Sequence, residues 1–470
     1  MKKFTKILLI GCLLVTVSCN NWLDVEPKSQ VKDKDLFASE MGFKEALSGV
    51  YSLMTKEALY GKELTFGWLG VLGQEWTSVP YNYEDDQKYD FENAASEVRI
   101  DSVWTGLYNA IANANKLLKE LEGKENLFSG DNYFIIKGEV LALRAYLHFD
   151  LLRIFGASCT VGMERIAIPY VTEYAPTIFP QEKVGDFVGK VLNDLQDAAK
   201  CLENDPILTG RTVSEIDDNG YLMNRQVHLN YYAVKGLMAR VYLYKGDYAN
   251  AEVCAKEVIG SGCFEWVKQE NLTNESVADL TFSTEHLFAL NIVTLGNIVD
   301  KYLDGGNNSF ALEESRLSEY YGSSYDYRYL YLFKTGVGMS NTLRYLKKYD
   351  QLESVSWAQS YRNKLPLICL PEMYYILAEC RYHSSGDVLE PLNEVCRHRG
   401  VADLSEADLS AFETLLLAEY RKEVIGGGQL FFQYKRSVVP GTDVDLAGEG
   451  RYVIPMPKEE LENPGWVSNQ

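Results

Sequence analysis

The sequence predicts an all-α protein, a tetratricopeptide-like helical repeat scaffold with long irregular loops that are rich in aromatic residues. Three observations support this fold class. Apolar residues recur at three- and four-residue steps through most of the chain, which is the period of a helix with one buried face. One segment has the spacing of small residues and glycine that is typical of a tetratricopeptide unit. Many of the 32 tyrosines and 7 tryptophans fall in the stretches between the helical segments.

Helical periodicity is clear in nine segments. In 36–54, Phe43, Leu47 and Val50 follow one another at helical steps, and Asp101 is placed to cap the helix that follows it. Residues 133–155 are apolar nearly all round, so this helix should be buried among other helices, while its charged side chains exclude a membrane span. The predicted helices are 36–54, 101–122, 133–155, 181–203, 227–245, 248–260, 366–384, 387–399 and 408–425.

The repeat spacing lies in 227–260. Here Ala239, Tyr242, Gly246, Tyr248 and Ala251 occur at the positions where small residues let two antiparallel helices approach and glycine allows the turn. One such unit cannot bury its apolar face alone, so partner units are expected. The candidates are 101–155 and 366–399.

The N-terminus has the layout of an export signal. Three lysines precede the uninterrupted apolar or small run 7–17, which is too short to span a membrane. Ser18 then precedes Cys19, whose thiol and new amino end could both be acylated, and two or more chains hold a protein stably on a membrane. A plain secretory signal and lipidation at Cys12 are the alternatives. Cys19 is preferred, because cleavage at Cys12 would leave an apolar stub.

These observations divide the chain into three parts. Residues 1–18 are the removed signal, 19–34 a lipidated tether, and 35–470 a single domain. Removal of the signal, which holds three lysines and no acid, takes the net charge from −20 to about −23. Such a surface repels nucleic acid, so no nucleic-acid partner is expected. The nine cysteines are scattered and do not form a disulfide framework.

Sequence motifs of catalysis are missing, so the chain is not expected to be an enzyme. It has no nucleophile elbow, zinc-protease helix, phosphate-binding loop or dinucleotide fingerprint. Cys380, His383, Cys396 and His398 would lie on two paired helices, but their spacing is not a usual zinc spacing. The acidic loop 82–87 could hold a structural calcium ion, although a solvated loop is the plainer interpretation. The prediction is therefore that the protein has no metal and no cofactor.

Two aromatic-rich loops, about 62–95 and 262–345, are the candidate ligand-binding segments. Aromatic rings can lie flat on the apolar faces of sugar rings, and nearby Asn, Asp, Gln and Arg side chains can bind the hydroxyls. Within 325–329, tyrosines alternate with charged residues, as in a strand with two unlike faces. The alternative is that these rings pack the loops onto the helices. The predicted ligand-binding residues are Trp68, Trp76, Tyr81, Tyr83, Tyr321, Tyr325 and Tyr327.

Several segments together resemble the SusD/RagB family of outer-membrane nutrient-binding lipoproteins. They follow the order of that family along nearly the whole chain. They are "CNNWLDVEPKSQV" (19–31), "VWTGLYNAIANANKLL" (103–118), "GEVLALRAYLHFDLLRIFG" (138–156), "AVKGLMARVYLYKGDYANAEVCAKEVI" (233–259), "LPLICLPEMYYILAEC" (365–380), "LNEVCRHRGV" (392–401), "LAEYRKEVIGGGQLFFQYKR" (417–436) and "YVIPMPKEELENPG" (452–465).

The resemblance implies a function in nutrient uptake. Members of this family are lipid-anchored at the cell surface on the outer membrane, where they capture oligosaccharides, and in some branches peptides. They deliver these ligands to a SusC-like TonB-dependent transporter and perform no covalent chemistry. Their ligand contacts lie on variable loops, so no binding residue can be transferred. A peptide or glycopeptide receptor and a protein-interaction scaffold without a small ligand remain the alternatives.

Overall fold

The computed structural model describes residues 34–274, 278–336, 342–351, 361–436 and 452–468. The predicted signal, Cys19 and all of the predicted tether except Lys34 lie outside these residues. The longer helices are α3 (Glu40–Met54), α6 (Ala94–Leu121), α7 (Asn132–Phe155), α9 (Val184–Cys201), α11 (Tyr231–Lys245), α12 (Tyr248–Gly260), α14 (Leu295–Tyr302), α15 (Glu314–Tyr321), α17 (Leu370–His383), α18 (Leu389–His398) and α19 (Phe412–Val424).

Shorter elements lie between them. The short helices are α4 (Trp68–Leu72), α5 (Glu84–Gln87), α8 (Cys159–Gly162), α10 (Pro206–Thr209), α13 (Glu270–Thr273), α16 (Tyr327–Tyr331) and α20 (Leu430–Arg436). The strands are β1 (Ile166–Pro169), β2 (Gln181–Lys183), β3 (His286–Asn291), β4 (Leu312–Glu313), β5 (Phe333–Thr335), β6 (Leu343–Leu346) and β7 (Lys364–Cys369). They pair antiparallel as β1–β2, β3–β7 and β4–β6–β5.

Local chemistry explains where several helices begin and end. The Asn93 side chain accepts hydrogen bonds from the backbone N–H groups of Ala95 and Ser96, so α6 begins at Ala94. The prediction that Asp101 caps this helix is therefore wrong. Gly246 ends α11 in the left-handed conformation, with φ 81°, and α12 starts two residues later. This is the turn that the repeat spacing predicts.

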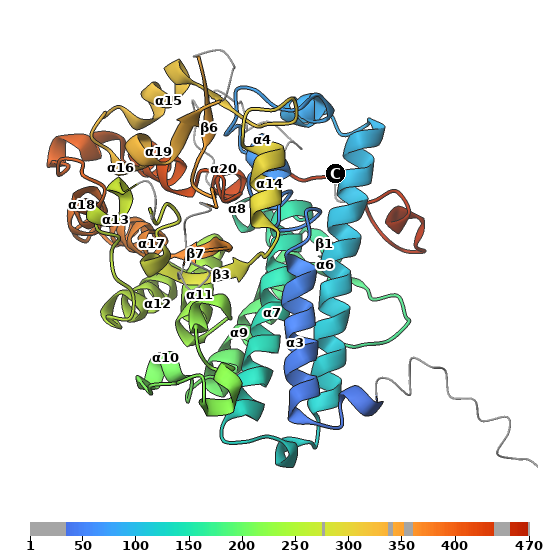
Figure 1. Cartoon of the computed structure of the whole chain (residues 1–470). Helices are drawn as coiled ribbons and strands as arrows, with labels where there is room; N and C mark the ends of the chain where they lie inside the picture. The colour runs from blue at the N-terminus through green and yellow to red at the C-terminus, as the bar shows by residue number, and fades with distance from the viewer. Residues whose placement is uncertain (1–33, 275–277, 337–341, 352–360, 437–451, 469–470) are drawn as a thin grey trace, which may run out of the picture.

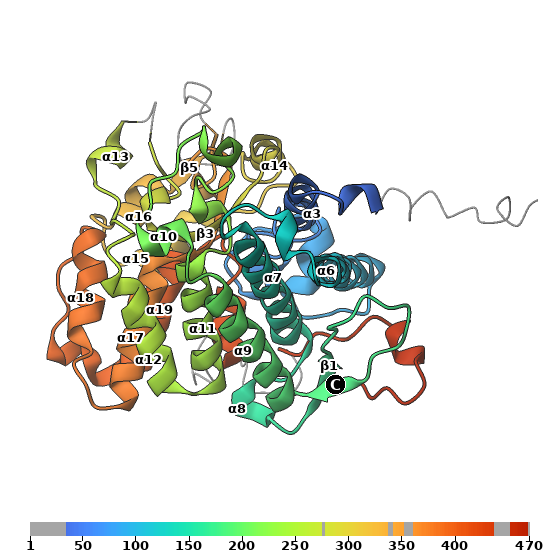
Figure 2. The same ribbon diagram turned by 90° about the horizontal axis from the view of Figure 1, so that it is seen from below.

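The helices form an antiparallel array that confirms the predicted all-α, tetratricopeptide-like fold. Neighbours pack in the order α6, α7, α9, α11, α12, α17 and α18. Figures 1 and 2 show this series crossing the molecule, from α6 on one side to α18 on the other. Helices within each of the three predicted repeat segments lie against one another, as α6 with α7, α11 with α12 and α17 with α18.

Segment 325–329 does not form the predicted strand. Most of it belongs to the short helix α16, whose first turn is capped by the Asp326 side chain through the backbone N–H of Arg328. The side chain of Arg328 is buried and forms ion pairs with Asp326, Glu419 and Glu423. The alternating charges therefore belong to a buried ion-pair network and do not mark a polar strand face.

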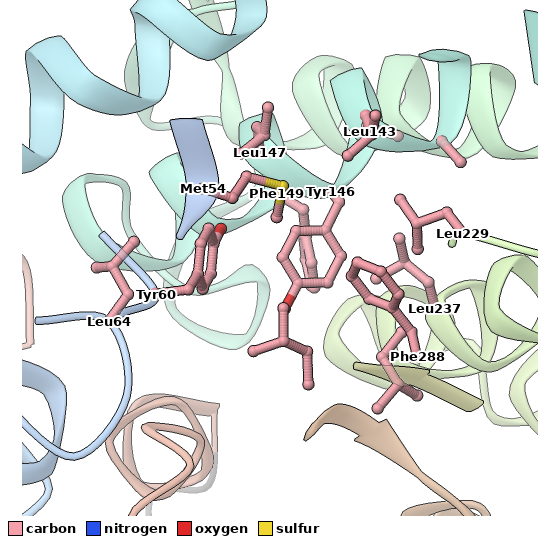
Figure 3. Packing of buried hydrophobic residues seen from close by; sticks show 14 of the residues in the cluster. Met54, Tyr60, Leu64, Leu143, Tyr146, Leu147, Phe149, Leu229, Leu237 and Phe288 are labelled. Carbon is pink, nitrogen blue, oxygen red and sulfur yellow. The ribbon is translucent and has the colours of Figure 1, made fainter. Parts of the chain in front are cut away.

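The main core is built around α7, which packs between α6 and α9. Tyr146 on α7 packs edge-on against Tyr60 and Phe288, with Met54 and Leu237 nearby (Figure 3). Four charged residues of α7 are also buried, and each has a partner inside the protein: Glu139, Arg144, Asp150 and Arg153. Among the described helices, none is both long and apolar enough to cross a membrane.

Candidate functional site

Four of the seven predicted ligand-binding residues lie in the core. Trp68, Trp76, Tyr83 and Tyr321 are almost completely buried. The indole N–H of Trp68 donates to Asp86 Oδ1 at 2.9 Å, and that of Trp76 donates to the carbonyl oxygen of Phe66 at 2.8 Å. The structure corrects the prediction that these rings form an exposed surface. Their large apolar area is buried, and the polar end of each indole is satisfied within the protein.

A buried ionic group explains why loop 62–95 folds inward. Arg99 on α6 lies 3.9 Å from the ring centroid of Tyr83 and forms an ion pair with Asp86. The Tyr83 hydroxyl donates to Glu63 Oε1 at 2.8 Å. Because each charged group has partners, the segment can bury its tryptophans without leaving a charge unpaired. Tyr321 is held in a similar way on the other loop, where its hydroxyl donates to the carbonyl oxygen of Lys422 at 3.0 Å.

Two of the predicted residues are exposed. The exposed fractions are 86% for Tyr81 and 76% for Tyr325, whereas Tyr327 is half-buried. Tyr81 lies in the turn directly before α5, and Tyr325 lies two residues before α16. Each of the two exposed rings can contact a ligand from its own segment of the chain.

The four residues weighed as zinc ligands do not form a cluster. Burial raises the pKa of the Cys380 thiol to about 12 and that of Cys396 to about 11, which opposes formation of the metal-binding thiolate. His383 stacks on Tyr248 with centroids 3.9 Å apart, and His398 stacks on Trp266 at 4.7 Å. No group of three or more His, Cys, Asp or Glu side chains suited to a metal ion occurs within the described residues.

Loop 82–87, the candidate for a calcium site, does not gather its acidic side chains at one place. Asp86 is buried and already binds Arg99 and the indole of Trp68. Glu84 and Asp85 are exposed at the surface of α5. The buried carboxylate and the exposed ones therefore do not act as one ligand set.

An aromatic-lined groove runs beside the N-terminal half of α6, and we call it the α6 groove. It has a volume of about 470 Å³. α6 supplies one wall, the loop after β1 supplies the second, and the C-terminal segment 457–466 supplies the third. The aromatic members of its lining are Trp104, Tyr108, Phe179 and Trp466, and the polar members are Thr105, Asn109, Thr177, Glu460 and Asn463.

Hydrogen bonds hold the walls of the α6 groove together. Trp104 Nε1 donates to Glu460 Oε1 at 3.1 Å, which joins α6 to the C-terminal segment. The Tyr108 hydroxyl donates to the carbonyl oxygen of Pro169 at 2.9 Å. Burial raises the pKa of Tyr108, so the phenol stays protonated as this bond requires. The Trp466 indole nitrogen is buried and has no hydrogen-bond partner among the described residues.

A second shallow depression adjoins the α6 groove. It also has a volume of about 470 Å³ and lies between the end of α3 and α6. Thr105 and Asn109 line both hollows, so the two meet along the exposed edge of α6.

Sequence reasoning missed this groove. Its α6 residues were assigned to a packed helix, and segment 457–466 is more than three hundred residues away in the chain. One usable signal was Trp466, a large aromatic residue beside Pro464 and Gly465 in a segment without helical periodicity. The arrangement can bind the flat apolar face of a ring and its polar substituents, because aromatic surfaces stand beside amide and carboxylate oxygens.

The sequence of this chain is similar to those of known proteins. Residues 21–243 match the SusD-like family described as "Starch-binding associating with outer membrane". A SusD-like protein of Formosa agariphila is 24% identical over 269 residues, which are 56% of this chain and 47% of that protein. A second from the same organism is 26% identical over 33% of this chain and 30% of its own length. The chain thus spans about half the length, or less, of these curated relatives.

Solved structures match over most of the chain. A SusD superfamily protein of Bacteroides thetaiotaomicron has a TM-score of 0.74 at 21% identity and covers 92% of this chain and 100% of its own. A laminarin-binding SusD-like protein has a TM-score of 0.63 at 18% identity, with coverage of 91% and 100%. The family match over residues 21–243, the curated relatives and the solved structures together support a SusD/RagB-type protein.

The family that matches residues 21–243 is starch-binding and associates with the outer membrane. The solved SusD structures are less than 25% identical to this chain, so their likeness concerns the fold.

Proposed function

We propose that this protein captures oligosaccharides at the cell surface and delivers them to a SusC-like TonB-dependent outer-membrane transporter. The single observation that supports capture most strongly is the α6 groove. It combines exposed parts of aromatic side chains with Asn109, Asn463 and Glu460 in one depression. The family description as starch-binding is consistent with this chemistry.

The shape of the surface favours a chain of sugars over a single sugar. The α6 groove and the depression beside it each have a volume of about 470 Å³, within the range of about 300–1,000 Å³ that ligand sites occupy. Because Thr105 and Asn109 belong to both, a linear ligand can continue from one into the other. Trp466 and Tyr108 would receive the apolar faces of the sugars, and the amides would bind their hydroxyls.

Lipidation would anchor the protein at the cell surface. Acylation of Cys19 would hold the folded domain on the outer membrane through residues 19–34. Residues 1–18 would be removed on export. Binding alone is proposed, without hydrolysis or a cofactor, and the SusC-like transporter would take up the captured chain.

The experiment is a binding screen of the purified chain on an array of plant and host glycans, followed by calorimetry on each hit. Trp466→Ala should weaken binding of a confirmed glycan by about tenfold or more, since aromatic truncation at a ligand surface removes a large contact area. The matched variant is Tyr81→Ala, which removes an exposed ring on the predicted loop outside the α6 groove.

Each result separates the alternatives. A loss confined to Trp466→Ala supports the groove, whereas a loss confined to Tyr81→Ala would return the site to loop 62–95. If peptides bind and no glycan on the array does, the peptide-receptor alternative is favoured. Because the net charge of the chain is −20, we would then expect cationic peptides to bind best. Release of shortened products from a labelled oligosaccharide would contradict the assignment as a binding protein.

A further inference from the structure

A third hollow lies on the other side of the molecule, and we call it the α17–α19 hollow. It is bordered by the α11–α12 turn, the end of α17, the start of α19 and α20, and its volume is about 160 Å³. In both views α17 and α19 lie far from the C-terminal segment that forms the α6 groove (Figures 1 and 2). No residue lines both hollows.

Two stacked pairs of rings form part of the wall of this hollow. Tyr382 stacks on Phe412 with centroids 4.2 Å apart and an interplanar angle of 19°. His383 stacks on Tyr248 at 3.9 Å and 17°. Phe412 is the buried member of the first pair, and Tyr382, its partner, is 44% exposed. A ring that enters the hollow therefore meets aromatic surface that is already held in position.

Polar groups lie deeper in the α17–α19 hollow. Arg436 Nη2 donates to Glu379 Oε2 at 2.8 Å and to Gln433 Oε1 at 2.8 Å. Gln433 is largely buried, and its amide oxygen is the atom that accepts from Arg436. Tyr420, which also lines the hollow, is 1% exposed, and its hydroxyl oxygen has no hydrogen-bond partner among the described residues.

The charges in this hollow favour a neutral ligand. Glu379 is paired with Arg436 through both carboxylate oxygens, so neither is left to neutralise a buried ligand charge. The other carboxylate of the lining, Glu413, is exposed to solvent at the rim. An ion in the buried part of the hollow would therefore lose its hydration without gaining an unpaired buried counter-ion. A neutral ligand with hydroxyl groups would instead satisfy the phenol of Tyr420 and the amide of Gln433.

The volume restricts the ligand further. At about 160 Å³, the hollow is smaller than the roughly 300–1,000 Å³ that drug-sized ligands occupy, so it has room for one ring. A sugar ring combines the required properties, because it is neutral, has an apolar face for Tyr382 and carries hydroxyls around its edge. The choice of a sugar also rests on the proposed function, although the site shares no residue with the α6 groove.

We propose that the α17–α19 hollow is a second carbohydrate site that binds one neutral sugar ring. The ring lies against Tyr382 and hydrogen-bonds to Tyr420 and Gln433. A glycan with several branches could then engage the protein at two separated places, and the combined affinity would exceed that of either site.

The test uses the full chain in detergent and the methyl glycosides of glucose, galactose, mannose and N-acetylglucosamine as probes. Saturation-transfer NMR titrations give the affinity of each probe. Tyr382→Ala should weaken binding by about fivefold or more, because it removes the stacking surface. Tyr420→Phe should weaken it by about two- to tenfold, the range for one lost hydrogen bond, with little change in stability.

The matched control is Tyr244→Phe. Tyr244 is also buried with a hydroxyl that lacks a described partner, but it does not line the hollow. Binding that falls in Tyr382→Ala and Tyr420→Phe and persists in Tyr244→Phe supports the proposal. Absence of binding by all four glycosides, or equal loss in all three variants, would overturn it. Trp466→Ala distinguishes the two proposals, because it should impair oligosaccharide binding at the α6 groove and leave glycoside binding in the hollow unchanged.

Discussion

Arg225 and Glu139 form an ion pair in the interior, with Arg225 Nη1 2.7 Å from Glu139 Oε1 and both side chains almost completely buried. Arg225 also pairs with Asp205 at 2.8 Å. Glu139 accepts a further hydrogen bond from the Tyr51 hydroxyl at 2.9 Å, which links α7 to α3. This group therefore joins the helical array to the irregular segment that precedes α11.

Arg225→Ala should lower the free energy of unfolding by about 3–5 kcal/mol, because it leaves two carboxylates buried without their partner. Urea unfolding followed by circular dichroism measures the change. The control is Arg397→Ala, which removes an exposed arginine paired with Glu394 at 2.7 Å and should cost about 1 kcal/mol or less. Equal losses in the two variants would contradict the structural role of the buried group.

Stability should fall as the pH drops from 7 to 5, owing in part to His148. The Nε2 atom of His148 accepts from the Val171 N–H at 3.0 Å, and Nδ1 lies 2.9 Å from the carbonyl oxygen of Arg144, so the ring is neutral in the fold. Burial lowers the pKa of His148 to about 3 from its usual 6.5. The unfolded chain therefore binds a proton below pH 6.5 that the folded chain does not, and stability is lost as pH falls toward 3.

Between pH 7 and 5 this linkage amounts to about 2 kcal/mol for one histidine. His286, whose pKa burial lowers to about 4, should contribute a similar amount. Urea unfolding at the two pH values should show a smaller pH dependence of the free energy of unfolding in His148→Asn than in the unchanged chain. The contribution of His286 to this pH dependence should remain in the variant. A pH dependence that is the same in both proteins would show that His148 is not the titrating group.

Trp76→Ala should lower the stability of the protein and should not act through a ligand contact. The ring is buried and its N–H donates to Phe66, so truncation should reduce the free energy of unfolding by about 3–5 kcal/mol. Chemical denaturation gives this value, and calorimetry on the folded variant gives the affinity for a confirmed glycan. Unchanged stability with a selective loss of affinity would place Trp76 in a binding site after all.

Cys19→Ala should abolish retention on the outer membrane while glycan binding by the folded domain is preserved, because two lipid chains are what hold such a domain on a bilayer. Membrane fractionation and intact mass measurement report the outcome. Retention of the variant, together with the absence of lipid mass on the unchanged protein, would contradict lipidation at Cys19.

Much of the fold follows from sequence pattern. The helices around Phe43, Tyr242 and Gly246 were predictable, since apolar spacing and a left-handed glycine turn act within a few residues. The burial of the aromatic residues in the loops could not be predicted in this way. Trp68 and Trp76 have the composition of a sugar-binding surface, but the buried partners Asp86 and Phe66 decide that they belong to the core.

By itself, the sequence determined the all-α class, the order of the helices and the resemblance to the SusD/RagB family, because these depend on local periodicity and on motifs along the chain. Only the tertiary structure decided which aromatic rings remain accessible. Trp104 and Trp466 come together in the α6 groove from opposite ends of the chain, and Tyr382 meets Phe412 across two helices. A ring becomes a binding surface only when packing leaves its face open beside polar groups, and that depends on contacts between residues far apart in sequence.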